Sequence, residues 1–249
     1  SQIRYYGLCS YSSSSISGGV INNSFIANGY YGLYNYSSSI SGGVINNSFI
    51  GSGDHGLLNS YSSIYGGVID NNFADNGSAG LWNDGSIQGG ITGNNFSNNS
   101  SSYGLISSYG RSISGDITNN VFANNSYGLY IESNSISGGI TNNQFVNNTN
   151  YGLNLQYSPV SGGITNNLFL NNSHGLRTYG ADADISGGVK NNLFVQNSNY
   201  GFYKYSSSTV DEVNYNGYFG NGTDIYSASK GAGAVDLGAD PFSSANPDK

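Results

Sequence analysis

Ile40-Ser-Gly-Gly-Val-Ile-Asn-Asn-Ser-Phe-Ile50, followed by His55-Gly-Leu57, is one copy of a unit that returns through most of this chain of 249 residues. The phenylalanine of the unit recurs every 23 to 26 residues. We expect one column of the repeat to consist of Phe25, Phe49, Phe73, Phe96, Phe122, Phe145, Phe169, Phe194 and Phe219. A period this short is typical of one structural unit that is stacked many times. The repeat therefore predicts a single elongated domain.

The composition separates this chain from several classes of protein. Charged residues make up 8% of it, against roughly 25% in ordinary soluble domains, and the net charge is −7. The seven Lys and Arg residues are scattered, so no basic stripe exists that could bind nucleic acid. No apolar run is long enough to span a bilayer, so membrane insertion is not expected. Low charge with an uncharged polar surface favours an extracellular or cell-surface protein.

Each unit contributes four apolar positions, and these recur in register from unit to unit. One column consists of Leu8, Leu33, Leu57, Leu81, Leu105, Leu129, Leu153, Leu176 and Phe202. The Gly, Asn and Ser residues between the apolar positions leave room only for strands of three to five residues with tight bends. Short strands at this spacing predict an all-β fold, a parallel β-solenoid whose coils lie ~4.8 Å apart.

Paired asparagines such as Asn46-Asn47 and Asn142-Asn143 return in most units. Asn tolerates the left-handed backbone conformation, and its amide can bond to the equivalent amide one coil away. The pairs therefore predict a corner of the coil with an asparagine ladder.

Units such as Gly-Val-Ile-Asn-Asn-Ser-Phe-Ile, followed by Tyr-Gly-Leu-Tyr-Asn-Tyr, resemble the repeats of pectate-lyase-like proteins. The resemblance covers roughly residues 5–222 and implies a right-handed parallel β-helix of about nine coils with ~24-residue repeats. We expect coils over residues 1–222, the first of them incomplete, and an irregular segment over 223–249 that covers the end. An uncovered first coil would suit either a fragment or head-to-tail assembly.

The residues that follow the leucine column are expected to point outward, because side chains alternate along a strand. They include a predicted binding face of Tyr34, Tyr36, Trp82, Tyr130, Tyr179, Tyr203 and Tyr205. Exposed aromatic columns on one sheet indicate a contact surface. The partner is left open between sugar rings, a neighbouring solenoid and a purely structural coat.

Many relatives with this β-helix cut acidic polysaccharides, so two carboxylates at a suitable separation could form a glycosidase pair. Asp84 and Glu132 fall in one column two coils apart, ~10 Å, which is near the upper limit for an inverting pair. Arg177 lies two coils further along. The relatives' clusters of acidic residues with a basic residue or His are absent, so solvated surface charges are the favoured interpretation.

Metal sites are not expected, and no cofactor is predicted. Asp182 and Asp184 lie in one longer loop and could hold calcium, the alternative being a solvated turn. His55 and His174 stand where other units have Tyr, and two histidines without any Met argue against copper handling. Cys9 is the single cysteine and is expected to be an unpaired thiol.

The sequence thus predicts a secreted or cell-surface, non-catalytic β-helix with a structural or adhesive role, for example as a filament subunit that assembles end to end. The alternative is a β-helix that binds or degrades polysaccharide through its aromatic face. The expected partners are other copies of the chain or a polysaccharide, and an enzymatic activity is left open.

Overall fold

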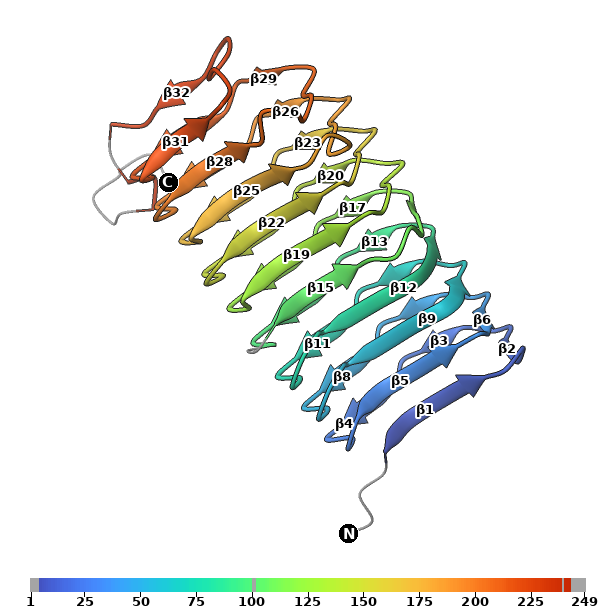
Figure 1. Cartoon of the computed structure of the whole chain (residues 1–249). Coiled ribbons are helices and arrows are strands. Elements are labelled where there is room, and N and C mark those ends of the chain that lie inside the picture. The colour runs from blue at the N-terminus through green and yellow to red at the C-terminus, as the bar shows by residue number, and fades with distance from the viewer. Residues whose placement is uncertain (1–4, 100–101, 239, 243–249) are drawn as a thin grey trace.

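The computed structural model describes residues 5–99, 102–238 and 240–242 as a stack of coils built from strands β1 to β32 (Figure 1). The described residues contain no helix, and so none that could cross a membrane. All strand pairs are parallel, and they form three sheets, named A, B and C below. The predicted all-β solenoid is confirmed.

Sheet A has thirteen strands and forms the broadest face of the stack. Its strands are β1 (Tyr6–Tyr11), β2 (Ser15–Ile16), β5 (Tyr31–Tyr36), β6 (Ser39–Ile40), β9 (Leu57–Ile64), β12 (Leu81–Gln88), β15 (Tyr103–Ser107), β16 (Ile113–Ser114), β19 (Tyr127–Glu132), β22 (Tyr151–Gln156), β25 (His174–Tyr179), β28 (Tyr200–Lys204) and β31 (Thr223–Tyr226).

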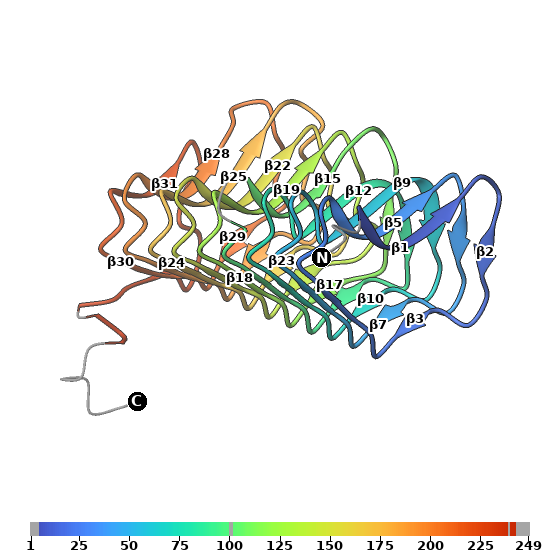
Figure 2. The same ribbon diagram turned by 90° about the horizontal axis from the view of Figure 1, so that it is seen from below.

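Sheets B and C have nine and ten strands. Sheet B consists of β3 (Val20–Ile21), β7 (Val44–Ile45), β10 (Val68–Ile69), β13 (Ile91–Thr92), β17 (Ile117–Thr118), β20 (Ile140–Thr141), β23 (Ile164–Thr165), β26 (Val189–Lys190) and β29 (Val213–Asn214). Sheet C consists of β4 (Ser24–Ile26), β8 (Ser48–Ile50), β11 (Asn72–Ala74), β14 (Asn95–Ser97), β18 (Val121–Ala123), β21 (Gln144–Val146), β24 (Leu168–Leu170), β27 (Leu193–Val195), β30 (Gly217–Phe219) and β32 (Val235–Asp236). Figure 2 shows sheet A on one side of the stack and sheets B and C on the other.

The core is a set of identical residues stacked from coil to coil. Leu33 pairs with Leu57, Val44 with Val68 and Phe49 with Phe73, so each predicted column forms as one line. Neighbouring Phe rings from Phe25 to Phe194 lie 4.8 to 5.0 Å apart and nearly parallel. Such offset stacks add to the burial that stabilises a core.

The last ring of this stack is Tyr218, and the prediction of Phe219 was wrong. Asn216 continues the asparagine ladder below Asn192, and the inward aromatic lies two residues after the ladder, as in every other coil. Tyr218 therefore pairs with Phe194 and is 1% exposed, whereas Phe219 turns outward.

Two buried asparagine ladders hold the corners beside sheet C. In the first, Asn143 donates from Nδ2 to the Ile117 and Thr141 carbonyls and to Asn167 Oδ1, at 2.9 to 3.0 Å. The residue before each ladder position takes a left-handed conformation, with a φ of 56° at Asn142. The second ladder runs from Asn76 to Asn221. The predicted corner and amide ladder are confirmed.

Strand lengths differ from the predicted three to five residues. Strands of sheet B have two residues, because the double glycine precedes them and the asparagine turn follows at once. Strands β9 and β12 reach eight residues, since they continue into the column of Ile64 and Ile87.

The coils also continue past residue 222, the boundary predicted from the sequence. β31 pairs with β28, placing Ile225 beside Phe202, and β32 pairs with β30. The leucine column is therefore extended by one residue before the regular pattern ends.

Candidate functional site: the aromatic face of sheet A

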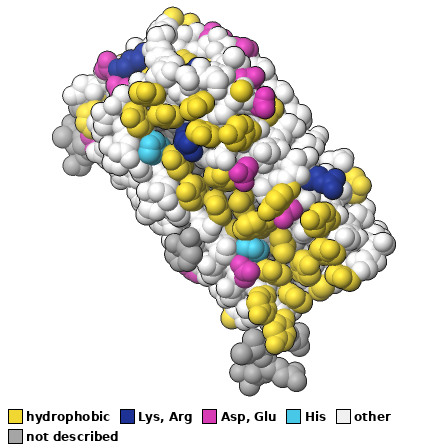
Figure 3. All heavy atoms as spheres, in the orientation of Figure 1, with side chains coloured by type: hydrophobic (Ala, Val, Ile, Leu, Met, Phe, Trp, Pro, Cys, Tyr) yellow, Lys and Arg dark blue, Asp and Glu magenta, His cyan; other side chains and the backbone are white. Residues whose placement is uncertain are grey.

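The outer surface of sheet A carries three columns of side chains that run along the whole stack. We call their aromatic members the aromatic face. The first column holds Tyr6, Tyr31, His55, Tyr103, Tyr127, Tyr151, His174 and Tyr200; the second holds Tyr34, Trp82, Tyr130, Tyr203 and Tyr226; the third holds Tyr11, Tyr36, Tyr179 and Tyr205. Figure 3 shows these side chains as a continuous apolar band with both histidines inside it.

Strand alternation positions the second and third columns. In β5, Leu33 and Asn35 point inward and are fully buried, while Tyr34 and Tyr36 point outward and are partly exposed. All seven residues predicted as a binding face lie on this surface, and the structure brings them together.

The first column was missed by the sequence reasoning. Tyr31 lies two residues before Leu33, so simple alternation would place it in the core. Gly32, inside β5, interrupts the alternation instead: a Cβ there would point into the core, 2.6 Å from the Gly56 carbonyl oxygen and 2.8 Å from the Phe49 ring, although Leu33 is also buried. The recurring Tyr-Gly-Leu motif was the available signal, because the residue before an inward-facing glycine lies on the outer side of the strand.

The rings of the first column cover each other's faces. Tyr31 lies 5.5 Å from Tyr6 and 5.4 Å from His55, with interplanar angles of 15° and 9°. A sugar or another protein therefore meets ring edges and hydroxyl groups along this column. Rings of the second column are tilted, as with Trp82 at 35° to His55 and Tyr130 at 57° to Tyr103.

Burial raises the pKa values of two phenols of the second column, Tyr34 and Tyr130. Burial, together with the nearby Tyr31 and Tyr36, raises the pKa of Tyr34 to about 12. Burial and the neighbouring Glu132 carboxylate raise the pKa of Tyr130 as well.

A pH-dependent loss of stability follows from the raised pKa of Tyr34. The unfolded phenol ionises near its ordinary value of 10.0 and the folded one near 12, so its contribution is complete below pH 10 and lost as the pH rises through 12. In urea unfolding at a series of pH values, Tyr34→Phe is expected to lose stability less steeply over that interval than the wild type. Equal slopes would contradict this assignment.

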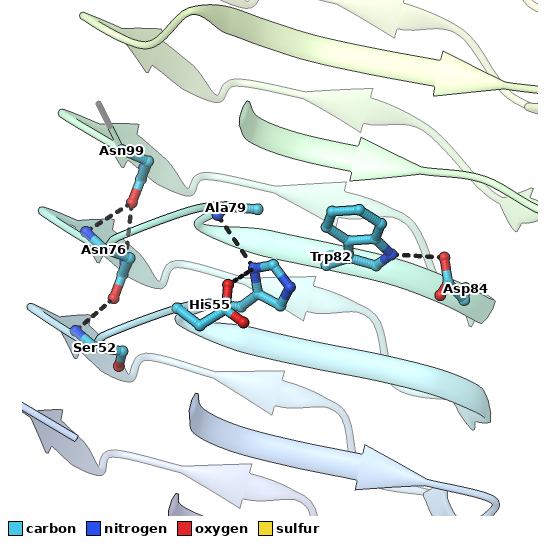
Figure 4. A network of polar contacts seen from close by, with 8 residues as sticks. Ser52, His55, Asn76, Ala79, Trp82, Asp84 and Asn99 are labelled. Carbon is cyan, nitrogen blue, oxygen red and sulfur yellow. Dashed lines mark hydrogen bonds and ion pairs between the residues drawn. The ribbon is translucent and has the colours of Figure 1, made fainter. Parts of the chain in front are cut away.

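Asp84 is engaged by its own neighbours (Figure 4). Its Oδ1 accepts a hydrogen bond from Trp82 Nε1 at 2.7 Å. It also accepts one from Ser108 Oγ at 2.9 Å. Burial raises the pKa of the Asp84 carboxyl, and the two hydrogen bonds act in the opposite direction. The carboxylate thus orients the only tryptophan of the chain.

Glu132 and Arg177 do not converge on Asp84. Glu132 Oε1 accepts from Gln156 Nε2 at 2.9 Å, two coils from Asp84, which is ~10 Å along the stack. The Arg177 guanidinium lies 4.4 Å from the Tyr179 ring centroid and 5.2 Å from that of Tyr151. The three charges are spread along the face, and Asp84 and Glu132 are each held by their own neighbours.

His55 is buried between the rings of Tyr31 and Trp82. Figure 4 shows its contact with Ala79, on the neighbouring coil that carries Trp82. His55 Nδ1 lies 3.2 Å from both the Ala79 backbone nitrogen and Asp54 Oδ1. Burial lowers the pKa of His55 against the opposing effect of Asp54, so the ring is neutral at pH 7 and accepts from the Ala79 N–H.

Asp182 and Asp184 share one turn, but they do not form a ligand cluster within the described residues. Asp184 Oδ1 accepts from the Thr209 backbone nitrogen in the next coil at 2.8 Å, which uses one oxygen that a calcium ion would need. Across the described part of the chain, no group of three or more His, Cys, Asp or Glu side chains could hold a metal ion.

Two family models match this chain. The one described as a right handed beta helix region matches residues 6–160, and the one described as periplasmic copper-binding protein (NosD) matches residues 102–235. No curated protein and no solved structure matches the chain. The first match confirms the right-handed coil that the resemblance implied.

The side chains that copper prefers do not assemble in this chain. Copper in proteins is bound by Cys, Met and His, and the sequence has no Met. Cys9 lies on β1, and His55 and His174 are five coils apart in the first column, ~24 Å. The residues present therefore do not fit a copper site.

Proposed function

Because the chain belongs to the right-handed β-helix family, and over residues 102–235 to the NosD family, we propose that it is a non-catalytic structural or adhesive protein. NosD is described as periplasmic, which supports a location outside the cytoplasm, extracellular or periplasmic. In this proposal the protein acts through the aromatic face of sheet A, and the coils serve as its scaffold.

The observation that carries the proposal is the continuity of the aromatic face. Aromatic rings lie on β1, β5, β12, β15, β19, β22, β25, β28 and β31, and His55 fills the place on the coil of β9. Large continuous apolar surfaces that remain on a folded protein usually meet a partner. The carboxylates on the same face are held apart by hydrogen bonds within the sheet, which favours binding over catalysis.

The proposed partner is a second copy of the chain, with the aromatic faces of the two copies in contact. Neither Arg177 nor Glu132 has an ion-pair partner within the described residues. They lie one coil on either side of Asn154. Two copies with antiparallel axes, related by a twofold axis at Asn154, would place each Arg177 opposite the other copy's Tyr130, with the Glu132 of that copy two residues further along the same strand. Self-complementary contacts of this kind are typical of closed dimers.

Sedimentation velocity over a wide concentration range tests this arrangement. The wild type is expected to associate, and Arg177→Glu to weaken association at least about tenfold by placing like charges near each other. The double variant Arg177→Glu/Glu132→Arg restores the complementary pair and is expected to recover most of the affinity. Wild-type monomers at every concentration, or no recovery in the double variant, would overturn the proposed pairing.

Polysaccharide binding is the second candidate, favoured by the tilted rings of the second column. Trp82 and Tyr130 turn part of their faces away from their neighbours, and apolar sugar faces pack on such rings. Retention of the protein on immobilised plant and bacterial polysaccharides should be lost in Trp82→Ala/Tyr130→Ala. Retention that survives this double change rules out the second column as a sugar site.

A further inference from the structure

Ten aromatic rings form an unbroken chain along sheet A. In order they are Tyr6, Tyr31, His55, Trp82, Tyr103, Tyr127, Tyr151, His174, Tyr200 and Tyr226. The centroids of successive rings lie 4.7 to 6.3 Å apart. Each ring is therefore within contact distance of the next.

Trp82 closes the one gap in this chain. The first column has Ala79 in the fourth coil, and a column of rings alone would be interrupted there. The Trp82 ring, from the second column, lies 4.9 Å from His55 and 6.3 Å from Tyr103. The largest aromatic side chain thus stands at the place where the column lacks a ring of its own.

We infer that this chain of rings conducts one-electron oxidising equivalents along the stack of coils. Apart from the thiol of Cys9, tyrosine and tryptophan are the side chains of this protein that strong one-electron oxidants, such as high-valent metal complexes or oxygen-derived radicals, oxidise most readily. The oxidant takes one electron from a phenol, whose proton passes to water. The next ring then gives one electron to that radical, which takes a proton back from water, and the newly oxidised ring releases its own proton, so that only the position of the missing electron changes.

The surroundings of the rings suit this transfer. Trp82 Nε1–H is hydrogen-bonded to the Asp84 carboxylate, which can accept the indole proton when Trp82 loses an electron (Figure 4). His55 and His174 are not oxidised themselves. At each histidine the electron passes directly between the two oxidisable rings on either side, which are two coils or ~10 Å apart. Tyr226 is 47% exposed, so a small reductant such as ascorbate can return one electron and one proton at that end.

The chain offers its own attachment point and reporter for the experiment. Cys9 is an exposed free thiol on β1, opposite Tyr34, and Trp82 is the only tryptophan. A ruthenium(II) polypyridyl label on Cys9, excited by a laser flash with a cobalt(III) ammine as electron acceptor, becomes a ruthenium(III) oxidant. Transient absorption is then expected to show the tryptophan radical of Trp82 growing in after the flash.

The test variant is Tyr31→Phe/Tyr34→Phe, which keeps the rings and their packing but removes the oxidisable phenols. Both changes are needed because Tyr34 lies 5.3 Å from Tyr31 and could bypass it. The double variant is expected to lose most of the radical yield. Tyr109→Phe, at a 74% exposed tyrosine outside the chain, is expected to keep it. No Trp82 radical in the wild type, or an undiminished yield in the double variant, would overturn the inference.

Discussion

Asn143→Ala is expected to lower the free energy of unfolding by about 2–6 kcal/mol, since it leaves the Asn120 backbone nitrogen and the Ile117 carbonyl without this buried partner, at about 1–3 kcal/mol each. Asn120 Nδ2 keeps its second hydrogen bond, to the Ile91 carbonyl. Asn120 donates to Asn143 Oδ1 from both its backbone nitrogen and its Nδ2, at 2.9 and 3.0 Å. Asn143 Nδ2 in turn satisfies the Ile117 carbonyl. No water reaches these groups, because Asn120 and Asn143 are both 1% exposed.

The neighbouring residue provides the control for this prediction. Asn142 has a φ of 56° and points outward, and glycine adopts that conformation freely, so Asn142→Gly should cost less than about 1 kcal/mol. Urea unfolding followed by circular dichroism measures both changes. Similar effects of the two substitutions would mean that the ladder contributes no more than the turn around it.

Phe122→Ala is expected to destabilise the stack by about 3–5 kcal/mol, the usual cost of removing a buried aromatic side chain. Phe122 is fully buried, and its ring lies 4.9 Å from Phe96 and 5.0 Å from Phe145. The backbone on either side is fixed by pairing with β14 and β21, so the space cannot close. A cavity therefore remains between the two rings.

Two variants separate the cavity from other causes. Phe122→Leu fills most of the volume and should lower the free energy of unfolding by less than half as much. Val121→Ala truncates an outward side chain of the same strand and should lower it by about 0.5 kcal/mol or less. Thermal unfolding reports all three. If Phe122→Ala were no worse than Val121→Ala, the phenylalanine stack would not be the stabilising core.

The repeat in the sequence predicted the interior of this protein almost completely. Stacked coils place each residue above its equivalent, so the columns of Leu33 and Phe49 and the ladder of Asn47 follow from spacing alone. Where the spacing shifts, as at Tyr218 and Phe219, counting from the preceding Asn216 gives the register and counting phenylalanines does not.

The surface was predicted only in part, because the alternation of β5 is interrupted between Gly32 and Leu33, which are both buried. Tyr34 and Tyr36 follow Leu33 and were placed on the outer surface, as the structure has them, whereas Tyr31 precedes Gly32 and was left out of the predicted face. The hydrogen bond from Trp82 to Asp84 joins a residue of the predicted binding face to a candidate catalytic carboxylate. It depends on the side-chain rotamers of both residues, which the spacing of residues in the sequence cannot predict.

The central claim, that the protein acts through the aromatic face, is tested most directly by iodide quenching of Trp82 fluorescence at increasing protein concentration. Trp82 is the only tryptophan and lies within the face, so fluorescence excited selectively at tryptophan reports this one position. We predict that quenching falls as the concentration rises in the wild type and stays constant in Arg177→Glu. Quenching that is independent of concentration in the wild type would contradict the account.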